Sequence, residues 1–334
     1  MRITVLMGGT SSERDVSLAS GLRVAGALRV GGHTVTAVDT VRGVLEAGEE
    51  AAMLSGRVVK TIPPNVEAMA LLNRKLPARV SQLPDTDVVF LALHGGTGED
   101  GTIQALLDLT GVPYTGSGHL ASALAMDKDL SKHLFRHAGV PTADWMMAPA
   151  TVDEVADTLG FPVIVKPSKQ GSTVGLSLVR DPALLEGAIT EAFRHDDEVM
   201  IEAFIPGREL TVGILGGVAL PVGEIIPMKE LYDYECKYTP GMAREIFPAE
   251  LTSEQTTQVQ HLAKLAFAAL KLGGCARIDF RMTLGGEFFC LEANTLPGMT
   301  ELSLIPQAAA AAGISFPALC ERIAQLALSS RKSG

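Results

Sequence analysis

Two segments near the C-terminal end of the chain alternate apolar and polar residues with the period of two that is typical of β-strands. In residues 276–282, the charged positions share one face: Arg277, Asp279 and Arg281. In residues 289–294, the apolar Phe289, Leu291 and Ala293 alternate with Glu292 and Asn294. The glycines at positions 285 and 286 favour a short turn between the two segments. We therefore predict an antiparallel hairpin with one polar face.

Pairing of these two strands would bring Asp279, Glu292 and Asn294 together, with Arg277 beside them. Carboxylate and amide oxygens are the ligands that Mg²⁺ prefers, and bound Mg²⁺ keeps positions for substrate phosphates. The hairpin therefore predicts a magnesium site. The structural alternative is a half-buried hairpin whose polar groups face solvent.

The first third of the chain alternates predicted strands and helices, which indicates a parallel sheet covered by helices. The predicted strands are residues 3–7, 33–38 and 87–93, and the predicted helices are residues 16–30 and 102–109. Residues 42–84 are less regular and polar in patches, and we expect a helix mixed with loops there without assigning its bounds.

The remainder mixes helices and strands without strict alternation, which is typical of α+β structure. Predicted helices are residues 120–125, 128–137, a segment after Pro182, 253–270 and two C-terminal helices. Predicted strands are residues 163–165, 199–204, 210–215, 222–226 and the hairpin. Residues 228–248 are polar and poor in regular pattern, as expected of a lid that covers a binding site.

Composition limits the class of protein and its partners. A chain of 334 residues with 47% hydrophobic and 20% charged residues is globular and long enough for two or three domains. A net charge of −10 and a pI near 5.2 argue against nucleic acid or an anionic membrane as the main partner. The chain starts with a predicted strand rather than a signal-peptide pattern, and its four cysteines show no metal-binding spacing. We expect a cytoplasmic protein with reduced thiols.

Two glycine-containing turns follow predicted strands of the first sheet. Gly8-Gly9-Thr10 lacks the spacing of a dinucleotide-binding turn, and Asp39 does not rescue that interpretation. The turn instead places Glu13 at the carboxyl end of the sheet, where α/β proteins bind ligands. The alternative is ordinary capping of the next helix by Ser12 or Asp15. The loop that begins at His94 contains four glycines in eight residues, which suits either close approach to a ligand or a plain tight loop.

Two central segments suit a nucleotide. Lys166 ends a strand and is followed by a Gly/Ser/Thr loop that runs through Ser172 to Gly175. An ammonium, hydroxyls and backbone N–H groups would suit a polyphosphate, although a surface hairpin fits as well and the order is not that of a Walker A loop. Apolar residues between Glu202 and Glu209 would suit an adenine with ribose hydroxyls at Glu209; the alternative is an edge strand with solvated carboxylates.

The joint order of these segments resembles the ATP-grasp D-alanine–D-alanine ligases over nearly the whole chain apart from residues 42–84. The motifs that carry the resemblance are long: the loop from His94, Tyr114-Thr115-Gly116-Ser117-Gly118, Met126-Asp127-Lys128, the loop from Lys166, the ω-loop-like segment from Tyr232 to Tyr238, and the segment from Leu291 to Thr300. The resemblance implies an α/β chain, α+β in its C-terminal parts, with an ATP-grasp fold and an N-terminal parallel-sheet domain. The implied domains are residues 1–116, 117–205 and 206–334.

The resemblance also implies a role for each matching residue. ATP would be bound by Lys128, Lys166, Ser172, Glu202, Ala203, Glu209 and Lys237, and two Mg²⁺, with Mn²⁺ able to substitute, by Asp279, Glu292 and Asn294. Glu13 would bind the ammonium of the first D-alanine, with His94 near its carboxylate. Arg277 and the backbone at Gly298 would stabilise negative charge at the reacting centre, and Ser303 and Leu304 would receive the second D-alanine. Ser172 would link Glu13 to Tyr238 of the lid.

The implied activity is ATP-dependent ligation of two D-alanines through an acyl phosphate, for peptidoglycan, by a cytoplasmic homodimer. The alternatives are a D-alanine–D-lactate ligase, which would want a different residue at Tyr238, an ATP-grasp ligase for other amino acids, and a non-catalytic nucleotide sensor. Cys236, Leu296 and Glu301 depart from the family pattern without removing a charge or ligand that the mechanism needs.

Overall fold

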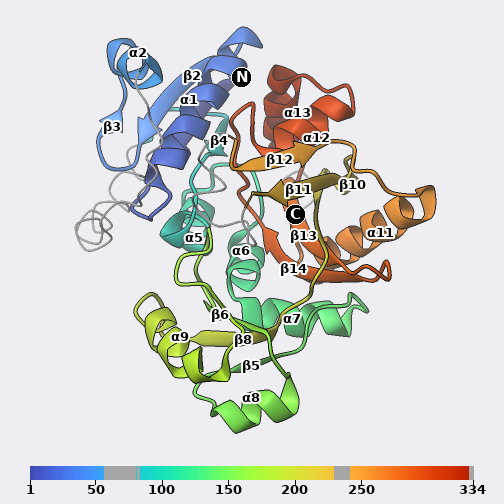
Figure 1. The fold of residues 1–334 in the computed structure, drawn as a ribbon. Helices are drawn as coiled ribbons and strands as arrows, with labels where there is room; N and C mark the ends of the chain where they lie inside the picture. Colours follow the sequence, from blue (N-terminus) through green and yellow to red (C-terminus); the bar gives the residue numbers. More distant parts are fainter. Residues whose placement is uncertain (56–79, 81–82, 229–240, 331–334) are drawn as a thin grey trace.

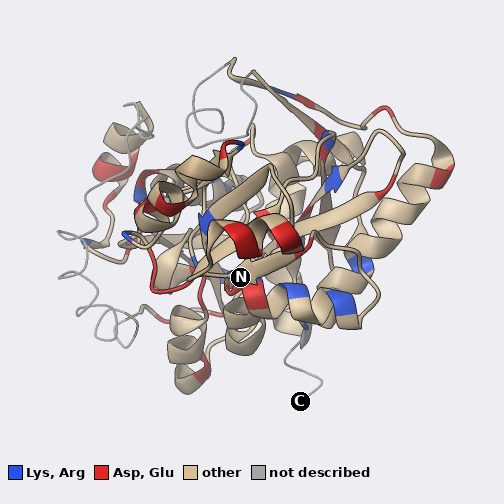
Figure 2. Ribbon diagram, turned by 60° about the horizontal axis from the view of Figure 1, so that its bottom comes forward, with Lys and Arg blue, Asp and Glu red and all other residues tan. Residues whose placement is uncertain are grey.

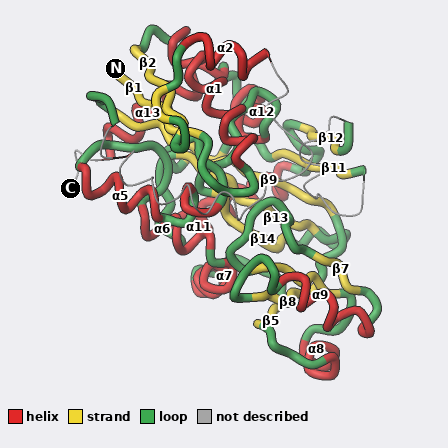
Figure 3. Tube along the Cα trace, turned by 90° about the vertical axis from the view of Figure 1, so that its left-hand side faces the viewer, coloured by secondary structure: helices red, strands yellow, loops and turns green. Residues whose placement is uncertain are grey.

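In the part of the chain that the structure describes, three β-sheets follow one another along the molecule (Figures 1 and 3). The computed structural model describes residues 1–55, 80, 83–228 and 241–330. The sheet at the N-terminal end lies beside the C-terminal helices, the central residues form the opposite end, and the third sheet lies between them. The predicted fold class, α/β with α+β parts, is confirmed.

The first sheet has the strand order β3-β2-β1-β4, and its three longer strands are parallel. Its elements are β1 (Arg2–Met7), α1 (Arg14–Val30), β2 (Thr34–Asp39), β3 (Gly43–Val44), α2 (Ala47–Ser55), β4 (Val88–Leu91), a 3₁₀ turn (Gly96–Gly98) and α5 (Thr102–Thr110). Helix α1 and the C-terminal helix α13 (Phe316–Ser330) pack on one face, and α5 packs on the other. Because both faces are covered, the buried positions of β1 and β4 are apolar apart from Thr4.

The central sheet is antiparallel, with the order β5-β8-β6-β7. Its elements are β5 (Trp145–Met147), α8 (Val152–Thr158), β6 (Val163–Pro167), β7 (Ser177–Val179), a 3₁₀ turn (Pro182–Leu184), α9 (Leu185–Ala192) and β8 (Val199–Ala203). Helices α8 and α9 bury the face that carries Val163, Val165 and Ile201. The opposite face carries Lys166 and Glu202, and α8 and α9 do not cover it.

The third sheet has the order β12-β11-β9-β13-β14, with β10 beside β9. Its strands are β9 (Arg208–Leu215), β10 (Val218–Ala219), β11 (Gly223–Pro227), β12 (Ala243–Ile246), β13 (Cys275–Met282) and β14 (Phe288–Asn294). Helices α6 (His119–Met126), α7 (Lys128–His137) and α11 (Ser253–Ala269) cover its apolar face. Helix α12 (Leu304–Ala311) packs against β9.

The hairpin formed by β13 and β14 is confirmed, but its predicted strict alternation is wrong on the second strand. The register shifts at Leu291, so that Asp279 pairs with Glu292 while Phe280 pairs with Cys290. Phe288, Cys290 and Ala293 are buried, whereas Phe289 and Leu291, which strict alternation would bury, are only half-buried. This β-bulge turns Leu291 toward the same side as Glu292.

Other predicted elements are confirmed with small shifts of their ends, and α2 lies in the segment where a helix among loops was expected. Several short elements were missed: β3, β5, α8, β7 and β10. The segment 228–248, predicted to lack regular structure, contains β12, which pairs with β11. Neither Ser12 nor Asp15 caps α1, because Glu13 occupies the N-cap position without a side-chain cap bond. Asp39 forms a buried ion pair with Arg14, at 2.5 Å. This ion pair explains why the carboxylate is present, and a bound dinucleotide is not needed to explain it.

Two glycines of α1 give a matched test of how closely the helix packs on the sheet. A Cβ at Gly21 would lie 2.5 Å from Cβ of Met7, whereas a Cβ at the exposed Gly26 would meet nothing within 4 Å. We expect Gly21→Ala to lower the free energy of unfolding by about 1–3 kcal/mol because of overpacking. Gly26→Ala should raise it by about 0.5–1 kcal/mol, since alanine favours the helix. Urea unfolding of both variants checks this, and equal effects would contradict it.

Candidate functional site

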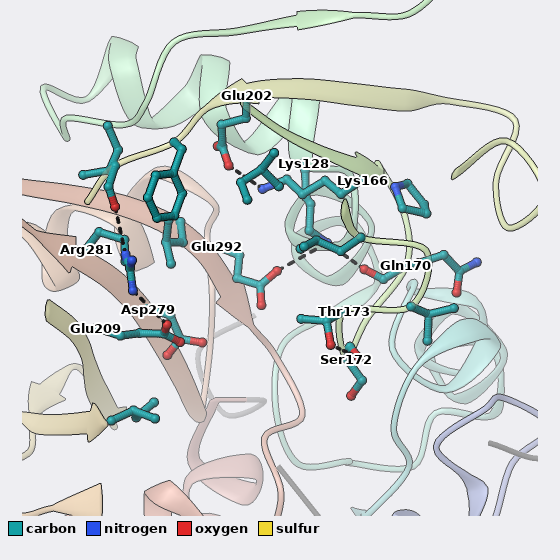
Figure 4. Close-up of a pocket in the computed structure, with 18 of the residues that line it drawn as sticks. Lys128, Lys166, Gln170, Ser172, Thr173, Glu202, Glu209, Asp279, Arg281 and Glu292 are labelled. Atoms are coloured by element: carbon teal, nitrogen blue, oxygen red, sulfur yellow. Dashed lines mark hydrogen bonds and ion pairs between the residues drawn. The ribbon is translucent and has the colours of Figure 1, made fainter. Parts of the chain in front are cut away.

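A cavity lies between the open face of the central sheet and the polar face of the third sheet (Figure 4). It encloses about 1020 Å³, solvent at its mouth included. Its charged lining brings together predicted nucleotide and metal residues, namely Lys128, Lys166, Glu202, Glu209, Asp279 and Glu292, with the predicted Arg277 and, in addition, Arg281. Its apolar lining comprises Ile164, Val174, Leu176, Ala203, Phe204, Ile205, Ile225 and Leu291.

Asp279 is the centre of the predicted metal patch. Its Oδ1 accepts a hydrogen bond from Thr211 Oγ1 at 2.7 Å, and its Oδ2 accepts one from Asn294 Nδ2 at 3.0 Å. Arg277 Nη2 forms an ion pair with Oδ2 at 2.8 Å. Three donors from three neighbouring strands thus fix the orientation of a carboxylate that is almost fully buried.

The chemistry of this donor set fits Mg²⁺. Asp279 and Glu292 are directly opposite across the strand pair, and the side-chain oxygen of Asn294 is the remaining donor. In the described part of the chain, no group of three or more His, Cys, Asp or Glu residues is placed to hold a metal ion. Two carboxylates and an amide leave coordination positions for phosphate oxygens, as Mg²⁺ sites at nucleotides usually do.

Lys128 connects this patch to the glycine-containing loop of the central sheet. Its Nζ lies 3.3 Å from Glu292 Oε2 and donates to the backbone carbonyl of Gln170 at 2.8 Å (Figure 4). Asp127 caps α7 by accepting from the N–H of Leu130, which fixes the start of the helix and with it Lys128. A cation is therefore held between the metal patch and the loop.

The loop after Lys166 is held in a specific conformation. Ser172 and Thr173 adopt left-handed backbone angles, with φ of 51° and 60°, which non-glycine residues rarely adopt. The loop is anchored where Lys169 N–H donates to Asp196 at 2.6 Å and Gln170 Nε2 donates to the carbonyl of His195 at 2.9 Å. Such strained positions are typical of ligand-binding loops.

Glu13 reaches this loop from the first sheet, because Ser172 Oγ donates to Glu13 Oε1. The carboxylate lies against two glycines: a Cβ at Gly95 or at Gly171 would come within 2.7 Å or 2.9 Å of Oε2. The predicted contact between Ser172 and Glu13 is therefore present, although the residues are 159 positions apart. Any side chain at either glycine would displace the carboxylate.

His94 and Glu99 connect the first sheet to the segment that follows β14. His94 Nε2 lies 3.0 Å from Ser20 Oγ, and Nδ1 lies 2.8 Å from the carbonyl of Leu296. Burial lowers the pKa of His94, although the charge of Glu13 acts to raise it. The lowered pKa favours the neutral ring. Glu99 accepts from the backbone N–H groups of Gly95 and Leu296, both at 3.1 Å. These contacts hold the His94 loop and the 295–300 segment together.

Glu202 is buried between two lysines. Its Oε2 accepts from Lys166 Nζ at 2.7 Å, and its Oε1 accepts from Lys132 Nζ. Burial alone would raise the pKa of Glu202, but the charges of Lys132 and Lys166 outweigh burial and hold that pKa at about 2. Burial lowers the pKa of Lys132, against the attraction of Glu202. The carboxylate is therefore ionised at every pH at which the protein would work.

Glu209 is oriented by Arg281, whose Nη1 donates to Glu209 Oε2 at 3.3 Å. Arg281 Nε also donates to the carbonyl of Ile205 at 3.0 Å, and its guanidinium lies 5.5 Å from the ring centre of Phe204. The side chain of Phe204 and the main chain around Ala203 therefore form one wall of the cavity, with Glu209 at its end.

The predicted second-substrate residues lie together after β14. A Cβ at Gly298 would come within 2.9 Å of Ser303 Oγ, and this oxygen accepts from the N–H of Thr300 at 3.1 Å. Ser303 is the N-cap residue of α12, and Leu304 is the first residue of that helix. The side chain of Leu304 is buried, so its backbone N–H is the group available at the helix start. Lys237 and Tyr238 lie outside the described residues.

Four residues of the site were missed from sequence. Arg281 shares a face with Arg277 and Asp279, and this alternation could have identified it. Leu291 enters the cavity only because of the bulge. Lys132 is one helical turn after Lys128, but nothing in the sequence indicates that it meets Glu202. Glu99 was part of a recognised loop, but its contact with Leu296 is a long-range contact that sequence alone does not reveal.

Comparisons with known proteins agree over the whole chain. The family model described as D-ala D-ala ligase N-terminus matches residues 2–117, and that described as D-ala D-ala ligase C-terminus matches residues 130–325. A D-alanine–D-alanine ligase of Citrifermentans bemidjiense is 44% identical over 326 residues, which cover 98% of this chain and 96% of the relative. One of Aquifex aeolicus is 42% identical over 325 residues, covering 96% of this chain and 98% of the relative.

Solved structures give the same result. The chain resembles the D-alanine–D-alanine ligase of Bacillus anthracis complexed with ATP with a TM-score of 0.78 at 32% identity, covering 100% of this chain and 99% of the other. It resembles the ligase of Coxiella burnetii with a TM-score of 0.82 at 28% identity, covering 100% and 95%. In the described residues, no helix is long and apolar enough to cross a membrane.

The burial of Glu99 predicts that the free energy of unfolding depends on pH. Burial and the charge of Glu13 raise the pKa of Glu99 to about 7, above its ordinary 4.5. Its stabilising contribution is complete below about pH 4.5 and is lost as the pH rises through 7. Relative to Glu99→Gln, the wild-type free energy of unfolding should therefore fall by about 1–3 kcal/mol between these pH values. Denaturant unfolding across this range checks it; parallel pH profiles for the two proteins would contradict it.

Proposed function

This chain belongs to the D-alanine–D-alanine ligase family, and on that basis we propose that it joins two D-alanines, with cleavage of ATP, by the steps that follow. The observation that carries the proposal is one cavity in which Lys166 of the central sheet and Lys128 of α7 face the acidic hairpin of the third sheet. The product would supply peptidoglycan synthesis. The proposed domains are residues 1–116, 117–205 and 206–334.

The first step converts a poor electrophile into a good one. A carboxylate oxygen of the first D-alanine attacks the γ-phosphorus of ATP, the bond from that phosphorus to the bridging oxygen breaks, and ADP leaves with an acyl phosphate formed. Lys128 and Lys166 would bind the phosphates. Glu209 would bind the ribose hydroxyls, and the main chain at Glu202 and Ala203 would bind the adenine. Glu13 would hold the ammonium of this D-alanine, which its contact with Ser172 supports.

Asp279, Glu292 and Asn294 would hold two Mg²⁺ ions, or Mn²⁺ in their place. When bound, the ions offset negative charge on the phosphates. Thr211 and Arg277 fix the orientation of the Asp279 carboxylate by donating hydrogen bonds to it.

In the second step, the amine of the second D-alanine attacks the acyl carbon as its neutral base, and inorganic phosphate leaves with the electrons of its C–O bond. The nitrogen gives up one proton as the amide forms, and the leaving phosphate can accept it. Arg277 and the backbone N–H at Gly298 would stabilise the negative charge that develops on the carbonyl oxygen. Ser303 and the N–H of Leu304 would receive the carboxylate of this substrate, a placement supported by their position at the start of α12. His94 would act near the first carboxylate by holding the loop around it, with Ser172, Tyr238 and Lys237 completing the closed site.

The test of this function is a panel of D- and L-amino acids and D-lactate, each with ATP and Mg²⁺, with products identified by mass. D-alanyl-D-alanine as the dominant product, with phosphate release that depends on D-alanine, is the expected result. A depsipeptide with D-lactate throughout pH 6 to 9 would instead assign the sibling activity. Sedimentation velocity tests the proposed homodimer, and cell fractionation the proposed cytoplasmic location.

Replacement of Glu292 tests the metal assignment. Glu292→Gln keeps the size of the side chain but removes the charge opposite Asp279, so dipeptide formation should fall about 100-fold or more. Glu287→Gln, an exposed change on the same hairpin, should stay within about twofold, as surface changes usually do. Initial rates at saturating ATP and D-alanine, with varied Mg²⁺, provide the measurement, and near-normal turnover of Glu292→Gln would reject Glu292 as a metal ligand.

Replacement of Glu13 tests the binding of the first ammonium. Glu13→Gln should weaken D-alanine binding at the first subsite at least tenfold, because removal of one partner of a desolvated charge pair typically costs about 3–5 kcal/mol. ATP affinity should change little. Asp15→Asn, in the first turn of the same helix, is the matched control. Calorimetric titrations with D-alanine and with ATP separate the two effects; unchanged D-alanine affinity would leave Glu13 as a helix-start residue.

A further inference from the structure

Lys132 lies behind the wall of the nucleotide cavity rather than in it. Its side chain is 0% exposed and is absent from the lining, whereas Lys166, bound to the same carboxylate, lines the cavity. Lys132 therefore cannot touch a nucleotide. Its two hydrogen-bond acceptors are Glu202 Oε1 and, at 2.6 Å, Thr142 Oγ1.

The surroundings of Lys132 hold it in one place. Thr142 Oγ1 in turn donates to the carbonyl of Cys290 at 2.7 Å, in the strand that carries Glu292. On its other side, Lys132 Nζ lies 5.0 Å from the ring centre of Trp145, in the strand β5 that pairs with Glu202. Lys132 is thus held by contacts on several sides, whereas Lys166 lines the cavity (Figure 4).

The charge balance of this cluster rests on three residues. Glu202 has two cations at its two oxygens, Lys132 at Oε1 and Lys166 at Oε2. If Lys166 turns toward a phosphate, it must give up a bond to a buried carboxylate. A buried charge left without a partner is strongly unfavourable, whereas one that keeps a hydrogen-bonded cation is tolerated.

We propose that Lys132 is a positioning residue that keeps Glu202 neutralised, so that Lys166 is free to leave this carboxylate and bind the phosphates of ATP. The inference rests on the proposed phosphate role of Lys166. Without Lys132, Glu202 and Lys166 would form an exclusive buried pair, and each ATP molecule would have to break it. The penalty would apply to ligands that carry phosphates and not to adenosine, which needs nothing from Lys166.

The test compares the dissociation constants of MgATP and of adenosine by calorimetry. The variants are Lys132→Met and Lys132→Gln, the latter keeping a neutral donor for Thr142 and Glu202 in case the former does not fold. Lys264→Gln, which removes an exposed lysine of α11, is the control. Trp145, the single tryptophan of the chain, lies against Lys132, so its fluorescence reports whether each variant keeps the local fold.

We expect both Lys132 variants to bind MgATP at least about tenfold more weakly, which corresponds to about 1.4 kcal/mol, and adenosine within about twofold of wild type. The KM for ATP should rise more than the KM for D-alanine. Equal losses for ATP and adenosine would mean that Lys132 only supports the pocket and would overturn the proposal, as would unchanged ATP affinity.

Lys166→Met separates this inference from the function on which it rests. If Lys166→Met weakens ATP but not adenosine while the Lys132 variants bind both normally, only the role of Lys132 is overturned. If Lys166→Met binds ATP normally, the phosphate role of Lys166 fails, and the inference about Lys132 fails with it.

Discussion

The pairing of β13 with β14 on one side and β9 on the other sets the geometry of the candidate site. This register places Asp279 opposite Glu292 and next to Thr211, and it puts Arg277 opposite Asn294. Each of these polar groups would be costly to bury alone, but together they satisfy one another's hydrogen-bonding capacity. A one-residue slip of either strand would turn half of them into the apolar core beneath the sheet.

The site is completed by segments that are far apart in the chain. The first sheet brings Glu13 to Ser172, and the loop at His94 is bonded to the carbonyl of Leu296. The same sheet is covered by the C-terminal helix α13. Because the two ends of the chain share one core, the residues proposed for the first and second substrates are held on a common support. The central sheet reaches this support through helix α7 and the loop that follows Lys166.

Charge is organised locally rather than over the whole molecule. The chain carries a net charge of −10, and Figure 2 shows acidic and basic positions interspersed along the described chain. Within the cavity, by contrast, lysines and arginines alternate with carboxylates: Lys166 with Glu202, Lys128 with Glu292, Arg277 with Asp279 and Arg281 with Glu209. Each cation is therefore held in a defined orientation by a carboxylate of the chain. A polyphosphate would compete with these carboxylates for the cations, which is the exchange proposed for Lys166.

The sequence by itself determined the longer elements and most of the chemistry that they carry. Period-two alternation identified the strand with Arg277 and Asp279, and long motifs identified the family and most residues of the cavity. What the sequence left open was decided by contacts between distant segments: the bulge at Leu291, the burial of Lys132 against Glu202, the contact of Glu99 with Leu296, and the packing of α6 and α7 on the third sheet. The reason is physical. Alternation and turn residues act over a few positions and are recorded locally, whereas the pairing of a buried charge depends on which surfaces meet when the sheets pack together.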